Sequence, residues 1–225
     1  MSEKKREFRV ARDIFIPSGG VRLAGELNIP ANAIGLVLFA DGSGSSRHSP
    51  RNKYVARVLH DSNIGTLLLD LLTEEEEDEE RYTRHLRFNI GLLAKRLADA
   101  TRWIKTQEGG QSLPIGYLGS STGAAAALVA AAELGKQVAV VVSRGGRPDL
   151  AEPSLAGVKA PTLLIVGGRD DQVIGLNRGA YGQLRCEKRL ELVDRATHLF
   201  EEPGALEEVA RLAAEWFKKH FDAAQ

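Results

Sequence analysis

The pattern of apolar and polar positions changes after residue 29. Residues 8–16 and 21–29 alternate between polar and apolar side chains and are joined across a Pro-Ser-Gly-Gly turn. This pattern is typical of an antiparallel hairpin with one exposed face. Residues 34–40, by contrast, are continuously apolar, as expected of a strand that is covered on both faces. From there on, short apolar runs alternate with longer segments in which apolar residues recur at helical spacing.

This alternation predicts an α/β fold, with a mostly parallel central sheet, helices on both faces and the antiparallel hairpin leading. Further strands are predicted at residues 64–69, 115–118, 138–142, 162–166 and 189–193. Helices are predicted at residues 51–62, 86–104, 124–134, 176–184 and 206–221. No linker or internal repeat divides the chain, so residues 1–225 are expected to form a single domain.

One segment departs from ordinary composition. Residues 72–80 read Leu-Thr-Glu-Glu-Glu-Glu-Asp-Glu-Glu. We interpret them as a solvated loop or as the start of the helix that ends at residue 104. Acidic residues would be favourable there, because a helix N-terminus carries the positive end of the helix dipole. A metal site is the alternative, but the run lacks the loop-defined spacing and the turn glycine that hard cations prefer.

Composition and charge exclude several classes of function. Lys+Arg and Asp+Glu both number 30 in the 225 residues, so no net charge draws the chain to nucleic acid or to an anionic membrane. Cys186 is the single cysteine, which excludes an internal disulfide and suits a reducing compartment. No signal peptide or membrane-length apolar run is found in the sequence. We therefore expect a cytoplasmic protein, monomeric or a small homo-oligomer, that acts on a neutral or weakly charged small molecule.

The most informative motif is Gly119-Ser120-Ser121-Thr122-Gly123, a Gly-x-Ser-x-Gly sequence between a predicted strand and a predicted helix. In that setting Ser121 would lie at a strained turn, and the two glycines would let strand and helix close around it. A serine hydroxyl needs a base, and the base needs an acid to orient it. Asp170 or Asp171 follows one later strand and His198 follows the last one, which gives the chain order of nucleophile, acid and base.

An acyl-transfer site also needs two donors for the oxyanion. The N–H of Thr122 is the expected first donor. The second is expected in the glycine-rich loop after residues 34–40, from Ser43 or, in reserve, Gly42. The same loop begins a dinucleotide-binding fingerprint, Gly42-x-Gly44, but Arg47 stands where its third glycine belongs.

These motifs resemble the α/β-hydrolase superfamily, and within it the small dienelactone hydrolase-like branch that lacks a cap domain. The resemblance covers nearly the whole chain and includes the stretches 119–123, 163–170 and 197–200. It implies Ser121 as nucleophile, His198 as base and, from the Gly-x-x-Asp spacing after Gly167, Asp170 rather than Asp171 as the acid. It implies no metal and no organic cofactor.

Two positions depart from the family pattern. Dienelactone hydrolases use a cysteine nucleophile, so Ser121 favours a general carboxylester substrate over a lactone. Relatives commonly carry His-Gly after the third strand, where this chain has Asp41-Gly42, and an inward-pointing carboxylate there would oppose an oxyanion. On the same rim, Arg144 and Arg147 are candidates to clamp a substrate carboxylate, with solvated turn arginines as the alternative.

The sequence therefore predicts a serine hydrolase that cleaves small carboxylic esters. Two alternatives stay open. One is a natural or engineered protein of the same fold, impaired by Asp41, that binds a small molecule without efficient turnover. The other is a nucleotide-binding domain that uses the Gly42–Gly44 turn.

Overall fold

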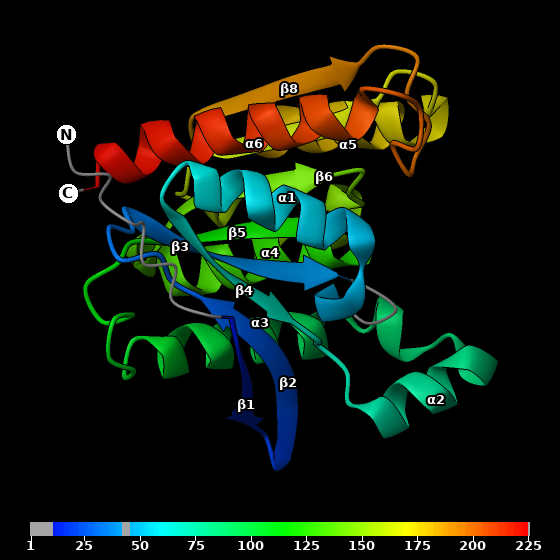
Figure 1. Cartoon of the computed structure of the whole chain (residues 1–225). Helices are drawn as coiled ribbons and strands as arrows, with labels where there is room; N and C mark the ends of the chain where they lie inside the picture. The colour runs from blue at the N-terminus through cyan, green and yellow to red at the C-terminus, as the bar shows by residue number, and fades with distance from the viewer. Residues whose placement is uncertain (1–10, 42–45, 225) are drawn as a thin grey trace, which may run out of the picture.

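The chain folds around one twisted sheet of eight strands in the order β1-β2-β4-β3-β5-β6-β7-β8 (Figure 1). This is a computed structural model that describes residues 11–41 and 46–224. The pairs β1–β2 and β2–β4 are antiparallel and the remaining pairs are parallel. The strands are β1 Arg12–Ser18, β2 Val21–Asn28, β3 Gly35–Asp41, β4 Ile64–Leu69, β5 Ile115–Ser120, β6 Val138–Arg144, β7 Thr162–Gly167 and β8 Lys188–Val193. The predicted α/β fold, with its leading hairpin, is thus confirmed.

Helices cover both faces of the sheet. Among the described residues the α-helices are α1 Pro50–Asp61, α2 Glu74–Thr83, α3 Ile90–Ile104, α4 Thr122–Leu134, α5 Asp171–Gln183 and α6 Ala205–Asp222. Helices α1 and α6 pack against each other over one face, and α3 and α4 pack over the other (Figure 1). No cap domain covers the sheet in the part of the chain that is described.

Helix α4 lies at the centre of its layer and is apolar on nearly all sides, with Glu133 as its one charged residue. Its four successive alanines, Ala124–Ala127, are completely buried. Their small side chains let the helix pack closely on β3, β5 and β6 while α3 covers its outer side. This close approach fixes the position of the turn that joins β5 to α4.

The segment between β4 and α3 differs from the prediction. The acidic run forms a helix of its own, α2, which begins at a capping box: Glu76 N–H donates to Thr73 Oγ1 and Thr73 N–H donates to the Glu76 carboxylate. Arg84, with a φ of 52°, ends it, and Asn89 caps a separate α3. The predicted helix 86–104 was therefore too long at its start, because Leu86–Phe88 form a 3₁₀ turn.

Helix α2 stands away from the sheet (Figure 1) and packs mainly on that 3₁₀ turn. Two carboxylates point inward from it. Glu76 forms a bidentate pair with Arg96 of α3 at 2.6 and 2.7 Å. Glu80 is completely buried and accepts from Leu86 N, Arg87 N and Arg87 Nε.

Helix α5 also begins earlier than predicted, at Asp171 rather than at residue 176. Gly175, Gly179 and Gly182 interrupt its apolar pattern, and glycine lowers helix propensity, which hid its first turn from sequence reasoning. None of the described helices is long and apolar enough to cross a membrane.

Candidate active site

The turn between β5 and α4 presents Ser121 in an unusual backbone conformation. Its φ is 51° and its ψ is −127°, a combination that residues with a side chain rarely adopt. Ser121 occupies the N-cap position of α4, yet its hydroxyl forms no capping hydrogen bond. A serine normally gains stability from capping a helix. Here the hydroxyl is instead left available at the tip of a strained turn.

The two glycines of the motif are required by close backbone contacts. A Cβ on Gly119 would lie 2.4 Å from Ala124 Cα, and one on Gly123 would lie 2.1 Å from the carbonyl oxygen of Ala40. No side chain fits at either position. The glycines therefore let α4 and β3 approach the Ser121 turn, as the sequence predicted.

The predicted acid and base contact each other directly. His198 Nδ1 lies 2.7 Å from Asp170 Oδ2. Asp170 follows β7 and His198 follows β8, and the loops that carry them are joined by a hydrogen bond from Arg169 N to Ala196 O. Asp171 instead begins α5 with an exposed side chain. The geometry therefore selects Asp170 as the partner of His198.

The loop after β6 connects this pair to the serine turn. Arg147 N donates to the carbonyl of Ser121 at 3.0 Å. A Cβ on Gly145 would lie 3.6 Å from His198 Cε1. Ser121 and His198 thus flank the same short loop, although no hydrogen bond joins their side chains among the residues described. Such bonds are often long in enzymes without substrate.

Of the expected oxyanion donors, the structure describes one. Thr122 is the first residue of α4 and is buried, so its N–H has no acceptor within the helix and lies at the positive end of the helix dipole. Ser43 and Gly42 lie outside the described residues.

Comparison with solved structures places this arrangement in a family. The crystal structure of dienelactone hydrolase from Anabaena variabilis is 58% identical in sequence and superimposes with a TM-score of 0.91, over 94% of this chain and 98% of that one. The chain belongs to the dienelactone hydrolase family of α/β-hydrolases. Est1E from Butyrivibrio proteoclasticus (14% identity, TM-score 0.78, 93% of this chain and 99% of that one) shares the fold. So does the Pyrococcus furiosus esterase Pf2001 (19%, TM-score 0.78, 98% and 96%).

Curated relatives carry a different name. A "Putative phosphoribosyl transferase" from two strains of Mycobacterium tuberculosis is 55% identical over 208 residues. Those residues are 92% of this chain but 46% of the relative, so the chain spans about half the length of the curated proteins it matches. No family model matches the chain.

In this chain, the two arginines that were candidates for binding a substrate carboxylate already have carboxylate neighbours. Arg147 donates Nε and Nη2 to Asp149 at 2.9 and 2.7 Å, which raises the pKa of Arg147 and occupies its bidentate edge. Arg144 is only 7% exposed and lies 3.9 Å from Asp41. A substrate carboxylate would have to compete with Asp149 for Arg147.

Asp41 lies at the end of β3 in a buried polar cluster that sequence reasoning missed. Asn52 of α1 donates Nδ2 to Asp41 Oδ2 at 2.5 Å and accepts from Arg144 Nη2 at 2.9 Å. Burial raises the pKa of Asp41, and the nearby Arg144 and the Asn52 hydrogen bond partly oppose that rise. The available signal was Asn52 itself, a polar residue on the inward face of a helix whose neighbours Val55 and Leu59 are apolar.

A hollow of about 510 Å³ opens at the same rim, beyond the end of β4. Asp70 holds Arg47 at its edge, with Arg47 Nε 2.6 Å from Asp70 Oδ2. The exposed ring of Phe15 and the guanidinium of Arg22 above it form the opposite wall. The hollow combines apolar and charged walls and lies on the side of Ser121 away from His198, because β4 and β8 lie on opposite sides of β5.

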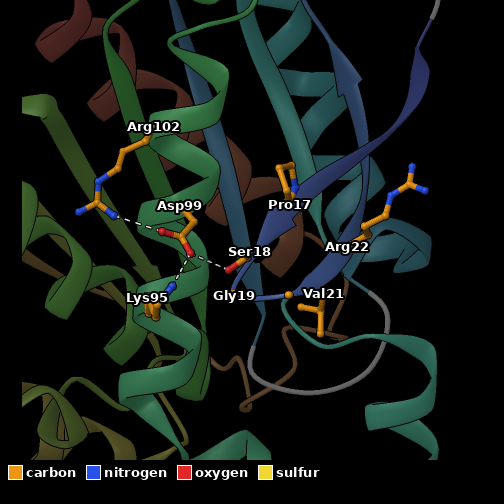
Figure 2. Close-up of a pocket in the computed structure, with 9 residues that line it drawn as sticks. Pro17, Ser18, Gly19, Val21, Arg22, Lys95, Asp99 and Arg102 are labelled. Atoms are coloured by element: carbon orange, nitrogen blue, oxygen red, sulfur yellow. Dashed lines mark hydrogen bonds and ion pairs between the residues drawn. The ribbon is translucent and has the colours of Figure 1, made fainter.

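A second, larger hollow of about 570 Å³ lies between the β1–β2 turn and α3 (Figure 2). At its centre Asp99 accepts from Ser18 Oγ at 2.7 Å, Lys95 Nζ at 2.7 Å and Arg102 Nη1 at 3.2 Å. Arg102 also donates to Glu133 at 2.7 Å. These charges satisfy one another and tie the hairpin to α3, and no residue of the Ser121 site lines this hollow.

Proposed function

We propose that the chain is a serine hydrolase that cleaves small carboxylic esters through an acyl-enzyme on Ser121. The observation that carries the proposal is the strained, uncapped Ser121 beside the loop that also contacts the His198–Asp170 pair. Membership of a hydrolase family supports the same reaction class.

The mechanism follows from the roles that this geometry permits. Asp170 holds Nδ1–H of His198, which leaves Nε2 free to take the proton from Ser121 Oγ as the oxygen attacks the ester carbonyl. The N–H of Thr122 donates to the resulting oxyanion. The imidazolium then gives its proton to the leaving alkoxide, and the acyl group stays on Ser121. Water, deprotonated by His198, attacks this ester and releases the acid, which restores the serine.

The hollow beyond β4 is the proposed binding site for one end of the ester. Its position away from His198 leaves the opposite side of Ser121 for proton transfer. Replacing Ala24, a partly exposed residue that lines the hollow, with Trp would narrow it. We expect the KM of Ala24→Trp to rise most for p-nitrophenyl esters with long acyl chains, in a panel that also includes lactones.

The decisive experiment is active-site labelling with a fluorophosphonate probe. We expect wild-type protein to be labelled and Ser121→Ala to be unlabelled. Ser120→Ala, which removes the adjacent hydroxyl of the same motif, is the matched control and should keep its label. Labelling that persists in Ser121→Ala would assign the nucleophile to another residue.

Asp41 favours a second candidate, a protein of the same fold that binds a small molecule without efficient turnover. A buried carboxylate one strand away from Ser121 opposes an oxyanion. Such a binder would take no probe and would still be stabilised against heat by its ligand.

The mycobacterial proteins are named for phosphoribosyl transfer, but this chain spans less than half of their length. We propose that the part of those longer proteins that matches this chain also hydrolyses esters, because it is 55% identical to this chain over 208 residues. The chain is proposed to act as a single domain in this reaction.

A further inference from the structure

The position of Asp41 poses an electrostatic problem for the proposed reaction. In the sheet, Asp41 of β3 lies directly beside Ser120, the residue before the nucleophile. Neighbouring strands are about 4.8 Å apart, and a charge at that range interacts strongly in a buried setting. An uncompensated carboxylate there would disfavour the negative oxygen that forms when Ser121 attacks.

Arg144 lies on the other side of the same residue. Ser120 of β5 is paired with Arg144 of β6 as well as with Asp41 of β3. The ion pair between Arg144 Nη2 and Asp41 Oδ1, at 3.9 Å, therefore crosses the end of the strand that carries the nucleophile. Asn52 bridges the two from α1, with one hydrogen bond to each.

The hydrogen bonds of Arg144 alone do not explain why an arginine occupies this buried position. Arg144 Nη1 is fully buried and has no hydrogen-bond partner within the described structure. A buried donor without an acceptor is unfavourable, and apolar side chains in place of both Arg144 and Asp41 would fill the space at no greater free-energy cost. What Arg144 supplies that an apolar residue could not is its positive charge.

The other groups near Asp41 do not supply that charge as directly. Arg51 of α1 and Asp70, which follows β4, act on Asp41 only through space and with opposite signs. Asn52 is neutral. Arg144 is the largest favourable influence on the ionised form of Asp41, and burial acts against both charges.

We propose that Arg144 is a positioning residue that cancels the charge of Asp41 beside the developing oxyanion. Together with Asn52 it keeps the end of β3 in place while leaving the site electrostatically neutral. This inference rests on the proposed serine hydrolase function.

Variants that remove each charge singly, and then both together, test this proposal. Arg144→Met leaves a negative charge next to the oxyanion, Asp41→Asn leaves a positive one, and the double variant leaves neither. Arg211→Met is the matched control, since Arg211 is a half-exposed arginine of α6 that pairs with Glu208 and Glu215. For each variant, kcat and KM for p-nitrophenyl acetate, the rate of fluorophosphonate labelling and the melting temperature are measured.

We expect Arg144→Met to lower kcat by about tenfold to a hundredfold with little change in KM, a smaller loss than deleting an oxyanion donor outright. Asp41→Asn should lose less. The double variant should recover most of the kcat lost by Arg144→Met, and Arg144→Lys, which keeps the charge, should do the same.

A role in packing alone gives a different result. Both single variants would then lose similar activity, and the double variant would be no better than the worse of them, which would overturn the proposal. If Arg144→Met does not fold, Arg144→Lys and the double variant decide, because folded and active protein is expected from both. Wild-type protein that takes no label would contradict the proposed hydrolase function, whereas labelled wild type without rescue contradicts only the role of Arg144.

Discussion

Two clusters of charge in this protein are built from similar residues and differ in almost every physical respect. In the Asp99 cluster, between the β1–β2 hairpin and α3, three donors converge on one carboxylate and the two cations are half-exposed. In the Asp41 cluster, at the end of β3, the arginine is 7% exposed and one of its nitrogens has no acceptor among the residues that the structure describes. The first cluster is a partly exposed set of ion pairs and hydrogen bonds that joins the hairpin to α3. The second retains a cost in free energy, because Arg144 Nη1 is unsatisfied within the described structure, and we propose that the charge of Arg144 is the reason.

The backbone turns that lie next to the two clusters also differ in conformation. The hairpin turn uses Gly19 and Gly20, which adopt positive φ without strain. The turn between β5 and α4, by contrast, places Ser121 at a φ of 51°. Among the described residues, the strained Ser121 and the unsatisfied Nη1 of Arg144 thus both lie at the carboxyl edge of the parallel strands, where function is proposed. The turn beside the other hollow is formed by glycines.

The largest expected effect is the loss of catalysis when the serine or the histidine is removed. Ser121→Ala and His198→Ala should each lower kcat for p-nitrophenyl acetate by roughly 10³ or more, because the three side chains act as a unit. Lys95→Met, in the Asp99 cluster, should leave kcat within about twofold, since exposed ion pairs contribute little. A large loss in Lys95→Met would show that the two hollows are functionally connected.

Next in size is a steric effect at the catalytic turn. Gly123→Ala would place a methyl group 2.1 Å from the Ala40 carbonyl oxygen, so β3 and α4 must separate. We expect it to lower the free energy of unfolding by about 3 kcal/mol or more, in the range of severe overpacking. Gly91→Ala in α3, where the nearest atom would be 3.8 Å away, is the control and should be neutral or stabilising. Urea unfolding curves measure both.

A smaller difference is expected when one partner of each cluster is removed. Arg144→Met leaves a buried carboxylate without its cation, which typically costs about 3 kcal/mol. Lys95→Met removes one of three donors to Asp99 and should cost about 1 kcal/mol or less. The two clusters would be energetically alike if urea unfolding gave equal losses for both variants.

The smallest effect is the pH dependence of stability, which should have opposite sign at the two carboxylates. Burial raises the pKa of Asp41, so the folded state holds this proton more tightly than the unfolded state does. Stability contributed at Asp41 should fall as pH rises above the ordinary value of 3.8. At Asp99 burial alone would raise the pKa, but hydrogen bonds from Lys95 and Ser18 lower it below 3.8, so stability is lost as pH falls through the lowered value.

Melting temperatures measured from pH 3 to pH 7 would test this difference. Asp41→Asn should flatten the decline toward higher pH, and Asp99→Asn should flatten the loss toward acid. Equal curves for the two variants would contradict the opposite signs.

Sequence reasoning predicted the sheet, its hairpin and most of its helices because buried parallel strands leave uninterrupted apolar runs. It also identified Ser121, Asp170 and His198 as candidates, since each directly follows a strand that ends at the same edge. It correctly allowed the acidic run to start a helix, but it began the helix that ends at residue 104 too early, because capping by Thr73 and Asn89 divides this segment into two helices. It also missed the pairing of Asp41 with Arg144. These two residues are 103 positions apart (144 minus 41), and a contact over that separation leaves no local pattern in the sequence.

Helix α2 has a consequence for how this scaffold can be altered. Its two inward carboxylates, Glu76 and Glu80, fasten it to α3 and to the 3₁₀ turn, whereas Asp78 and Glu79 between them are exposed. We therefore expect insertions at the exposed surface of α2 to leave the sheet undisturbed, because α2 packs mainly on the 3₁₀ turn. Thr73 lines the hollow beyond β4, so such insertions would alter the surface next to this hollow. Substrate selectivity could then be changed without altering the turn that holds Ser121.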